Sequence, residues 1–160
     1  FLLGPKTNFC FYRLNMKNVI LLVEDDELDV ISVQRSLKKL DEEYVLHTAY
    51  NGIEVLELLR GLKGPAIDPL PDVILLDLNM PKMNGIEFLR ALRTDEKLKD
   101  IQVFVMTTSG EEADRKAAEA LGVSGYLIKP LNFNNNNKRT DSMDGFVQFH
   151  IRKIFAGRSA

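Results

Sequence analysis

The sequence contains a single cysteine and little excess of charge of either sign. Cys10 has no partner within the chain, so an internal disulfide is excluded and the reducing cytoplasm is the expected location. The 21 Lys and Arg residues nearly balance the 23 Asp and Glu residues, and the net charge of −2 argues against a nucleic-acid-binding surface. No apolar run approaches the roughly 20 residues that a transmembrane helix requires, so no membrane span is expected.

The length of 160 residues, with 45% hydrophobic and 28% charged side chains, fits one globular domain with an adequate core and leaves no room for a second. Met16 stands shortly before the first apolar run. We therefore expect residues 1–15 to be an N-terminal extension, residues 16–156 to form the domain and residues 157–160 to form a short tail.

Short apolar runs alternate along the chain with segments whose apolar residues recur at helical spacing. The runs lie at residues 19–23, 44–50, 73–76, 101–106 and 125–128, and helices are expected at 27–40, after Asn51, after Asn84, at 110–121 and at 141–156. This alternation predicts an α/β fold with a doubly wound, five-stranded parallel sheet. The Asn-rich residues 131–140 are expected to form a loop.

Helical spacing also assigns side chains to the core. Asn51 can cap the second helix, and the residues of that helix expected to face inward are Ile53, Leu56 and Leu59. The core stripe expected for the last helix is Met143, Val147, Ile151 and Ile154. Phe146 and Phe149 fall on an adjacent face, where surplus exposed aromatic side chains would mark a partner site. Burial of both is the alternative.

Carboxylates follow two of the apolar runs. Asp77 ends the run at residues 73–76, and Glu24 and Asp25 follow the first run. Because ligands bind outside the carboxyl ends of strands in open α/β sheets, we expect these side chains to meet in one small volume. Like charges held so close raise a pKa unless a cation neutralises them, and Mg²⁺ suits such oxygen ligands. A carboxylate cluster without metal is disfavoured because buried unpaired charge is costly. Asp26 is expected to cap the first helix rather than to join the cluster.

Two further polar residues end strands at the same predicted edge. Thr107 follows the run at 101–106, and Lys129 follows the run at 125–128. A hydroxyl, an ammonium, three carboxylates and a metal ion together predict a phosphoryl-transfer site, in which one carboxylate attacks phosphorus. The charges support this interpretation, because Mg²⁺ and Lys129 would balance the carboxylates of Glu24, Asp25 and Asp77.

At these positions the sequence resembles the receiver domain of two-component response regulators, from about residue 19 to residue 130. Thr107 follows Asp77 by 30 residues and Lys129 follows it by 52, as in that family. The resemblance implies an acidic pair at Glu24 and Asp25, a phosphoacceptor at Asp77, a metal-binding backbone carbonyl at Asn79, a switch hydroxyl at Thr107, a switch aromatic at Tyr126 and the Lys-Pro pair at Lys129 and Pro130.

The resemblance also implies a fold and partners. The fold would be flavodoxin-like, (βα)5, with strand order 2-1-3-4-5. A sensor histidine kinase or a phosphotransfer protein would donate the phosphoryl group to Asp77 with Mg²⁺ as cofactor. The chain would catalyse only its own phosphorylation and dephosphorylation, and its output would be docking to a downstream protein. The longer loop at residues 61–71 is similar to that of stand-alone, phytochrome-associated receivers, which also suggests a homodimer.

An enzyme of the haloacid-dehalogenase-like phosphatase class is the alternative hypothesis. Such an enzyme also uses an Asp nucleophile after a buried strand, with Mg²⁺. It requires a second Asp two residues later as acid and base, and this chain has Asn79 there. Sustained turnover of phosphate esters would favour this alternative.

Overall fold

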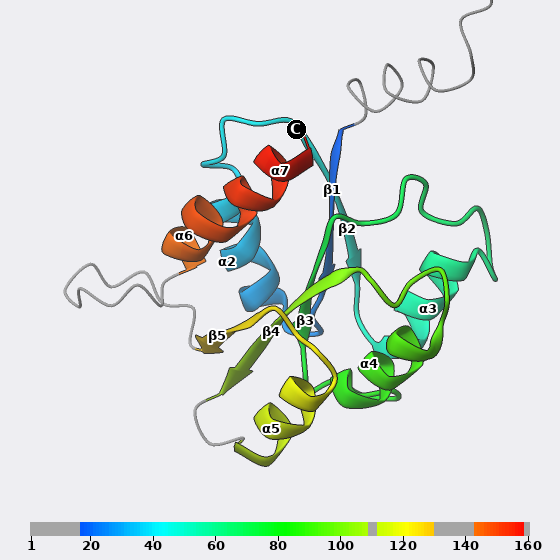
Figure 1. Cartoon of the computed structure of the whole chain (residues 1–160). Coiled ribbons are helices and arrows are strands. Elements are labelled where there is room, and N and C mark those ends of the chain that lie inside the picture. Colours follow the sequence, from blue (N-terminus) through cyan, green and yellow to red (C-terminus); the bar gives the residue numbers. More distant parts are fainter. Residues whose placement is uncertain (1–16, 109–111, 130–142, 159–160) are drawn as a thin grey trace, which may run out of the picture.

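The computed structural model describes residues 17–108, 112–129 and 143–158. Its centre is a five-stranded parallel sheet with strand order β2-β1-β3-β4-β5 (Figure 1). The strands are β1 (Asn18–Val23), β2 (Tyr44–Ala49), β3 (Val73–Asp77), β4 (Gln102–Thr108) and β5 (Gly125–Lys129). The α/β class, the parallel pairing and the strand order expected from the sequence are confirmed.

Helices connect the strands and follow the last one. They are α2 (Glu27–Leu37), α3 (Gly52–Arg60), α4 (Gly85–Thr94), α5 (Glu112–Ala120), α6 (Met143–Phe146) and α7 (Arg152–Arg158), with a π-helical turn η1 (Val147–Ile151) between the last two. Within the described residues, no helix is both long and apolar enough to cross a membrane. The predicted extension at 1–15, the predicted loop at 131–140 and the predicted helix starts at 110 and 141 lie outside the described residues.

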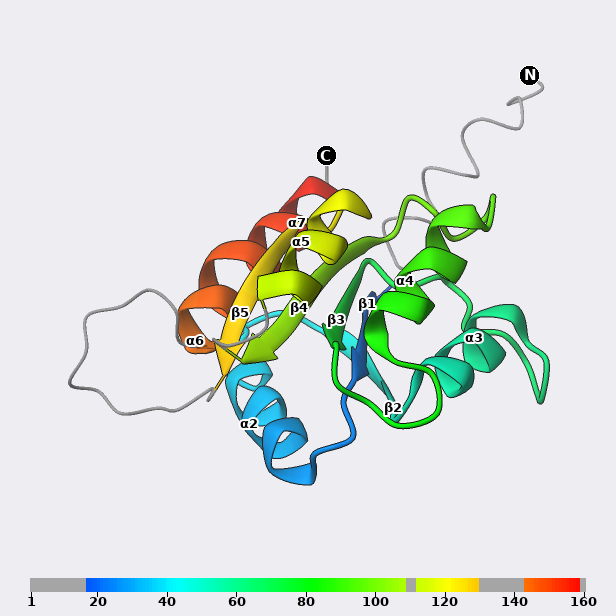
Figure 2. The same ribbon diagram turned by 90° about the horizontal axis from the view of Figure 1, so that it is seen from below.

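Apolar side chains cover both faces of the sheet, as a doubly wound fold requires. Successive residues of a strand point to opposite faces, and β3 shows the alternation clearly. Val73 and Leu75 belong to the core under α2 and the C-terminal helices, whereas Ile74 and Leu76 belong to the core under α3, α4 and α5. Figure 2 shows these helices arranged around the sheet. The five residues of β3 are therefore all buried.

Polar residues fix where the first helices begin. Asp26 accepts hydrogen bonds from the backbone N–H groups of Leu28, at 2.8 Å, and Asp29, at 3.3 Å. Asn51 accepts one from the N–H of Glu54 at 3.0 Å. Each bond satisfies an N–H group that has no partner inside its helix. The expectation that Asp26 caps the first helix is confirmed.

Two assignments made from helical spacing are wrong. Ile53 was expected to face inward, but it is 42% exposed, and Val55 is buried in α3 instead. Residues two apart on a helix lie about 200° apart around its axis, so burial of Val55 turns Ile53 to solvent. Helix α2 was expected to reach Leu40 but ends at Leu37. Leu40 is still buried, because a turn in which its N–H donates to the carbonyl of Leu37 returns it to the core.

The C-terminal helix confirms most of its expected stripe. Met143, Val147 and Ile151 are buried. Neither alternative for Phe146 and Phe149 holds for both rings: Phe146 is 4% exposed, whereas Phe149 is 67% exposed. The ring of Phe146 packs edge-on against Phe104, with 4.8 Å between centroids.

Phe104 is accessible to Phe146 because the neighbouring strand carries a glycine beside it. A Cβ atom at Gly125 would lie only 3.0 Å from the Phe104 ring. The contact between Phe104 and Phe146 joins residues far apart in the sequence, so helical spacing alone could not reveal it.

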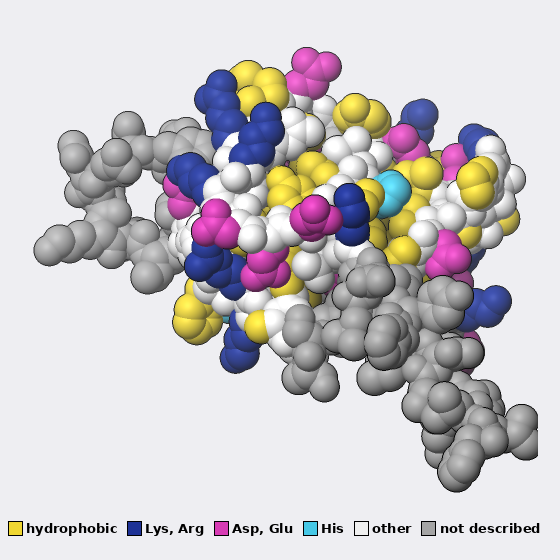
Figure 3. All heavy atoms as spheres, turned by 90° about the horizontal axis from the view of Figure 1, so that it is seen from above, with side chains coloured by type: hydrophobic (Ala, Val, Ile, Leu, Met, Phe, Trp, Pro, Cys, Tyr) yellow, Lys and Arg dark blue, Asp and Glu magenta, His cyan; other side chains and the backbone are white. Residues whose placement is uncertain are grey.

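Acidic and basic side chains are mixed on the surface where the strands begin. On the face seen from above in Figure 3, Lys and Arg side chains are interspersed with Asp and Glu. The described residues of this face therefore form no gathered basic patch of the kind that binds a phosphate backbone.

Candidate functional site

The candidate site lies at the carboxyl edge of the sheet. Asp77 is the last residue of β3, Lys129 is the last residue of β5, and Glu24 directly follows β1. The register pairs Val23 with Leu76, so Glu24 and Asp77 occupy neighbouring positions at the ends of adjacent strands. The sequence predicted this convergence, because all the strands of a parallel sheet end at one edge.

Three charged residues face the same side of the sheet. Their neighbours two positions earlier are Leu22, Leu75 and Leu127, which all belong to the core under α2 and the C-terminal helices. Because strand side chains alternate, Glu24, Asp77 and Lys129 point to this side as well. Helix α2, which begins just after Glu24, therefore covers the charged group.

The Lys129 ammonium is the centre of this group. Its Nζ lies 2.8 Å from Glu24 Oε2, 2.9 Å from Asp29 Oδ2 and 3.4 Å from Asp77 Oδ1. The Glu24 side chain is fully buried, and those of Asp77 and Lys129 are 5% and 13% exposed. Such burial strengthens each ion pair relative to one on the surface.

Asp29 is the site residue that sequence reasoning missed. It lies in the first turn of α2, where acidic residues occur commonly because they interact favourably with the helix dipole. Its position in a first turn therefore gave no reason to expect the contact with Lys129. The sequence feature that could have indicated this contact is the closeness of Asp29 to Glu24 and Asp25 in the chain.

Three carboxylates are close enough to share a metal ion. Oxygen atoms of Glu24, Asp25 and Asp77 all lie within 4.8 Å of one another, with Asp25 exposed to solvent and the other two buried. Asn79 donates its backbone N–H to Asp77 Oδ1 at 3.1 Å. The structure thus brings Asn79 beside the carboxylate, while a role for its carbonyl stays a prediction.

Burial dominates the ionisation of the carboxylates. It raises the pKa of Glu24 from 4.5 to about 7, although Lys129 and the backbone N–H of Asp26 act in the opposite direction. Burial also raises the pKa of Asp77, against the effects of Lys129 and Asn79. For Lys129, burial acts to lower the pKa, but the contacts with Glu24 and Asp29 raise it overall. The ammonium stays charged, and a further cation nearby would favour the ionised form of the carboxylates.

The donor set fits a hard divalent cation. Glu24 Oε2 is buried and ion-pairs with the Lys129 ammonium, 2.8 Å away. A buried acceptor with spare capacity, next to two more carboxylates, provides the all-oxygen surroundings that Mg²⁺ or Mn²⁺ binds.

Thr107 and Tyr126 lie on the other side of the sheet. Val105, two residues before Thr107, belongs to the core under α5, and Tyr126 packs partly buried against the same core. The Tyr126 hydroxyl donates a hydrogen bond to the backbone carbonyl of Arg115 at 2.9 Å. The two predicted switch residues therefore share the α5 face, whereas Asp77 and Lys129 face α2.

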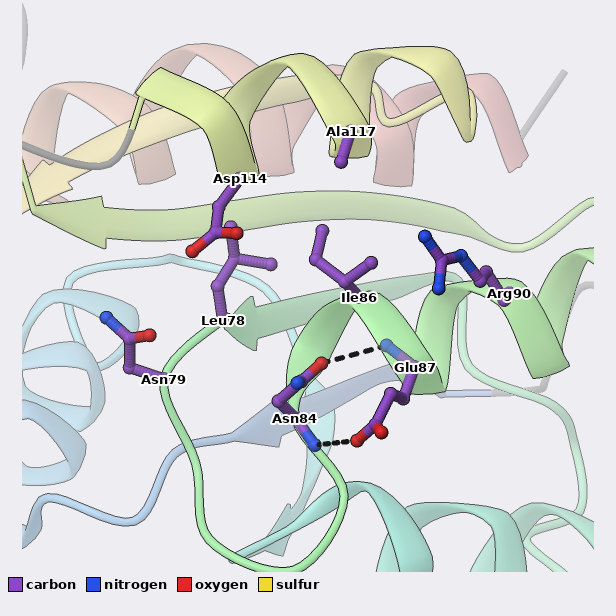
Figure 4. Close-up of a pocket in the computed structure, with 8 residues that line it drawn as sticks. All are labelled: Leu78, Asn79, Asn84, Ile86, Glu87, Arg90, Asp114 and Ala117. Carbon is purple, nitrogen blue, oxygen red and sulfur yellow. Dashed lines mark hydrogen bonds between the residues drawn. The ribbon is translucent and has the colours of Figure 1, made fainter.

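A hollow of about 310 Å³ opens beside Asn79, between α4 and α5 (Figure 4). Asp114 and Ala117 of α5 line one side of it. On the other side, a capping box fixes the start of α4: Asn84 accepts from the N–H of Glu87, and the Glu87 carboxylate accepts from the N–H of Asn84, both at 2.9 Å. Ala118 is the buried residue of α5. Helix α5 thus has a small apolar contact and free space beside it.

Comparisons with known proteins agree on one family. The family model of the response regulator receiver domain matches residues 20–140 of this chain. The response regulator Rcp1 of Synechocystis sp. is 36% identical over 132 residues, which cover 82% of this chain and 90% of Rcp1.

Solved structures give the same result. The phosphorylated cyanobacterial phytochrome response regulator RcpA has a TM-score of 0.73 at 32% identity, over 86% of this chain and 96% of RcpA. The Mn²⁺-bound form of Rcp1 has a TM-score of 0.70 at 34% identity, over 82% of this chain and 93% of that one.

Proposed function

Because this chain belongs to the response regulator receiver domain family, and so is a phosphoacceptor of two-component signalling, we propose that Asp77 is the residue that accepts the phosphoryl group. The observation that carries the proposal is the burial of Asp77 at the end of β3, with the Lys129 ammonium 3.4 Å from its Oδ1. Receiver domains receive phosphate from histidine kinases and act on downstream targets. They are switches rather than enzymes with a separate substrate.

The proposed reaction transfers a phosphoryl group between two side chains. An oxygen of Asp77 attacks phosphorus, the P–N bond to the donor's phosphohistidine breaks, and the imidazole nitrogen leaves with the bonding electron pair. The Lys129 ammonium is close enough to contact a phosphoryl oxygen during this step. Hydrolysis of the acyl phosphate by water would return Asp77 to its starting state.

Receiver domains bind a divalent metal, and we infer that this site holds Mg²⁺. Glu24, Asp25, Asp77 and the backbone carbonyl of Asn79 are the groups that would hold it. When bound, the ion would supply positive charge to the phosphoryl oxygens. The burial of Glu24 and the cluster of carboxylate oxygens within 4.8 Å support this assignment.

We infer that Thr107 and Tyr126 carry the signal from the site to α5. Thr107 is buried at the end of β4 and one strand away from Asp77. Attraction of its hydroxyl to a phosphoryl oxygen would draw the end of β4 toward β3. Tyr126 would respond because its hydroxyl is bonded to α5, whose contact with the core is small.

The proposed partners are a sensor histidine kinase or phosphotransfer protein, a downstream protein and a second copy of this chain. Phe149, on the outside of η1, supports an apolar contact between copies. The expected cytoplasmic location and the domain limits at residues 16 and 156 stay predictions.

Phosphorylation by acetyl phosphate with Mg²⁺, followed by intact mass measurement, tests the proposal. We expect the parent to gain the mass of one phosphoryl group and Asp77→Asn to gain none. Asp72→Asn is the matched control, because Asp72 directly precedes β3, at the end opposite to Asp77, and an amide oxygen can still accept from Val19 N–H, 2.7 Å away. Equal labelling of Asp77→Asn and the parent contradicts the assignment.

Phosphate esters provide the second arm of the test. The comparisons give no support to a haloacid-dehalogenase-like phosphatase, and Asn79 stands where that enzyme needs an acid. We expect no sustained turnover of a generic aryl phosphate by the parent protein.

A further inference from the structure

The Lys129 ammonium has a short contact with Asp29, a residue that the resemblance to receiver domains does not assign to the phosphorylation site. Asp29 Oδ2 lies 2.9 Å from Nζ, shorter than the 3.4 Å contact to Asp77. Asp29 belongs to α2, whereas Lys129 ends β5, so the ion pair links two elements that are far apart in the sequence. The Asp29 side chain is 23% exposed, and thus partly screened from water.

The ammonium has three N–H donors, and three carboxylates surround it. Two of these carboxylates have a second role in the proposed function. Glu24 would bind the metal ion, and Asp77 would bind it and accept the phosphoryl group. A cation draws their negative charge away from Lys129. Asp29 has no role in metal or phosphoryl binding in the proposed function, so its contact with Lys129 would persist through the cycle.

Asp29 also changes the net charge of the site. Mg²⁺ and the Lys129 ammonium would balance the three carboxylates of Glu24, Asp25 and Asp77, and Asp29 adds a fourth negative charge. The added charge makes the site less attractive to a phosphoryl group, which is itself an anion. A contribution to the site therefore has to come from geometry, namely from where Asp29 holds the ammonium.

We propose that Asp29 is a positioning residue that holds the Lys129 ammonium against α2, with one N–H directed at the phosphoryl group on Asp77. The proposal rests on Asp77 as the phosphoacceptor. Without Asp29, the flexible lysine side chain would spread over several rotamers, and its contact with the phosphoryl group would be made only part of the time.

Beryllofluoride, a mimic of the phosphoryl group, tests the proposal by ¹⁹F NMR in the presence of Mg²⁺. Its fluorine atoms stand where the phosphoryl oxygens would, and the resonance of the fluorine nearest Lys129 reports on the ammonium. We expect Asp29→Ala to move this resonance toward its position in Lys129→Ala. Asp29→Asn should leave it near the parent position, because the amide oxygen can still accept from Nζ.

Glu27→Ala is the matched control. Glu27 lies in the same first turn of α2, is exposed, and carries the same charge. Its removal changes the helix terminus and the net charge as Asp29→Ala does, and should leave every fluorine resonance in place. If Asp29→Ala fails to fold, Asp29→Ser replaces it, since serine suits a first turn but is too short to reach Nζ.

Unchanged resonances in Asp29→Ala, or equal shifts in Glu27→Ala, overturn the proposal. Failure of the underlying function gives a different result, because the parent itself would then bind no beryllofluoride and Asp77→Asn would accept a phosphoryl group. Binding by the parent, together with an unmoved resonance in Asp29→Ala, removes the role of Asp29 alone.

Discussion

The Tyr126 hydroxyl donates a hydrogen bond to the backbone carbonyl of Arg115, 2.9 Å away, and the Arg115 guanidinium lies 4.9 Å from the Tyr126 ring centroid. One residue of β5 thus holds α5 through both its hydroxyl and its ring. Since Ala118 is the buried residue of α5, these contacts contribute substantially to holding the helix in place.

Removal of the hydroxyl should therefore loosen α5. Tyr126→Phe keeps the ring but loses a hydrogen bond that contributes about 1 kcal/mol to stability. We expect faster amide hydrogen exchange in residues 112–120 and little change in β1 and β3. Tyr50→Phe serves as control, because Tyr50 is 50% exposed and directly follows β2, which lies at the opposite edge of the sheet from β5. Equal exchange in α5 of Tyr126→Phe and the parent contradicts the predicted restraint.

The metal-free protein should lose stability as pH rises from about 4.5 to about 7. Burial raises the pKa of Glu24 from 4.5 to about 7, so the folded state binds a proton more tightly than the unfolded state does. The contribution of Glu24 to stability is therefore fully present below the unfolded pKa and is lost as Glu24 ionises. The raised pKa of Asp77 acts in the same direction. Asp95 and Asp144, whose pKa values lie below 3.8, change stability only at lower pH.

Urea unfolding with EDTA, from pH 4.5 to 7.5, measures this dependence. The difference between the parent and Glu24→Gln isolates Glu24 from other titrating groups, because glutamine cannot ionise. We expect the stability of the variant relative to the parent to increase by on the order of 3 kcal/mol between pH 4.5 and pH 7.5. A difference that does not change with pH argues against a raised pKa.

The positions of Glu24, Asp77 and Lys129 could be predicted because each follows an apolar run in the sequence. Strand ends are visible in the sequence, and a parallel sheet brings them to one edge. Capping by Asp26 and Asn51 could be predicted for a similar reason, since it depends on residues two or three positions away.

Other features depend on contacts between distant segments and could not be read from spacing. The ion pair of Asp29 needs the relative placement of α2 and β5. Burial of Phe146 needs Phe104 and the space left by Gly125. Exposure of Ile53 follows from the rotation of α3 about its axis, which the packing of Val55 decides.

Asp25→Ala should weaken Mg²⁺ binding more than Glu24→Ala. Asp25 is exposed and its carboxylate is free of the Lys129 ion pair, so it can bind the metal directly. Glu24 is buried and already shares its charge with Lys129. Titration of each variant with Mg²⁺ gives the ranking, and Asp26→Asn controls for loss of one acidic charge in the same segment. Equal Mg²⁺ affinities of Asp25→Ala and Glu24→Ala contradict the predicted ranking.

Lys129→Ala should still accept a phosphoryl group but should fail to transmit the phosphorylated state. Asp77 keeps its carboxylate and its bond from Asn79 N–H, whereas the ammonium that would bind a phosphoryl oxygen is gone. Amide chemical shifts near Tyr126 should change on beryllofluoride binding in the parent and change much less in Lys129→Ala. Lys99→Ala, on the surface before β4, is the control. The same changes in Lys129→Ala as in the parent refute the coupling role.

Phe149→Glu should lower the molecular mass measured by light scattering. Phe149 is 67% exposed on η1, and its ring contacts the ring of His150. The His150 ring lies 5.2 Å from that of Phe104, so the exposed Phe149 is linked to the core by a row of ring contacts. A two-fold contact through this face would bury Phe149 against its counterpart, and a buried carboxylate there would oppose association. Leu62→Glu is the matched control, because Leu62 is 65% exposed in the loop after α3, on the other side of the sheet. Circular dichroism checks that both variants fold. A parent that is monomeric with and without beryllofluoride, or a Phe149→Glu variant as associated as the parent, removes the proposed dimer.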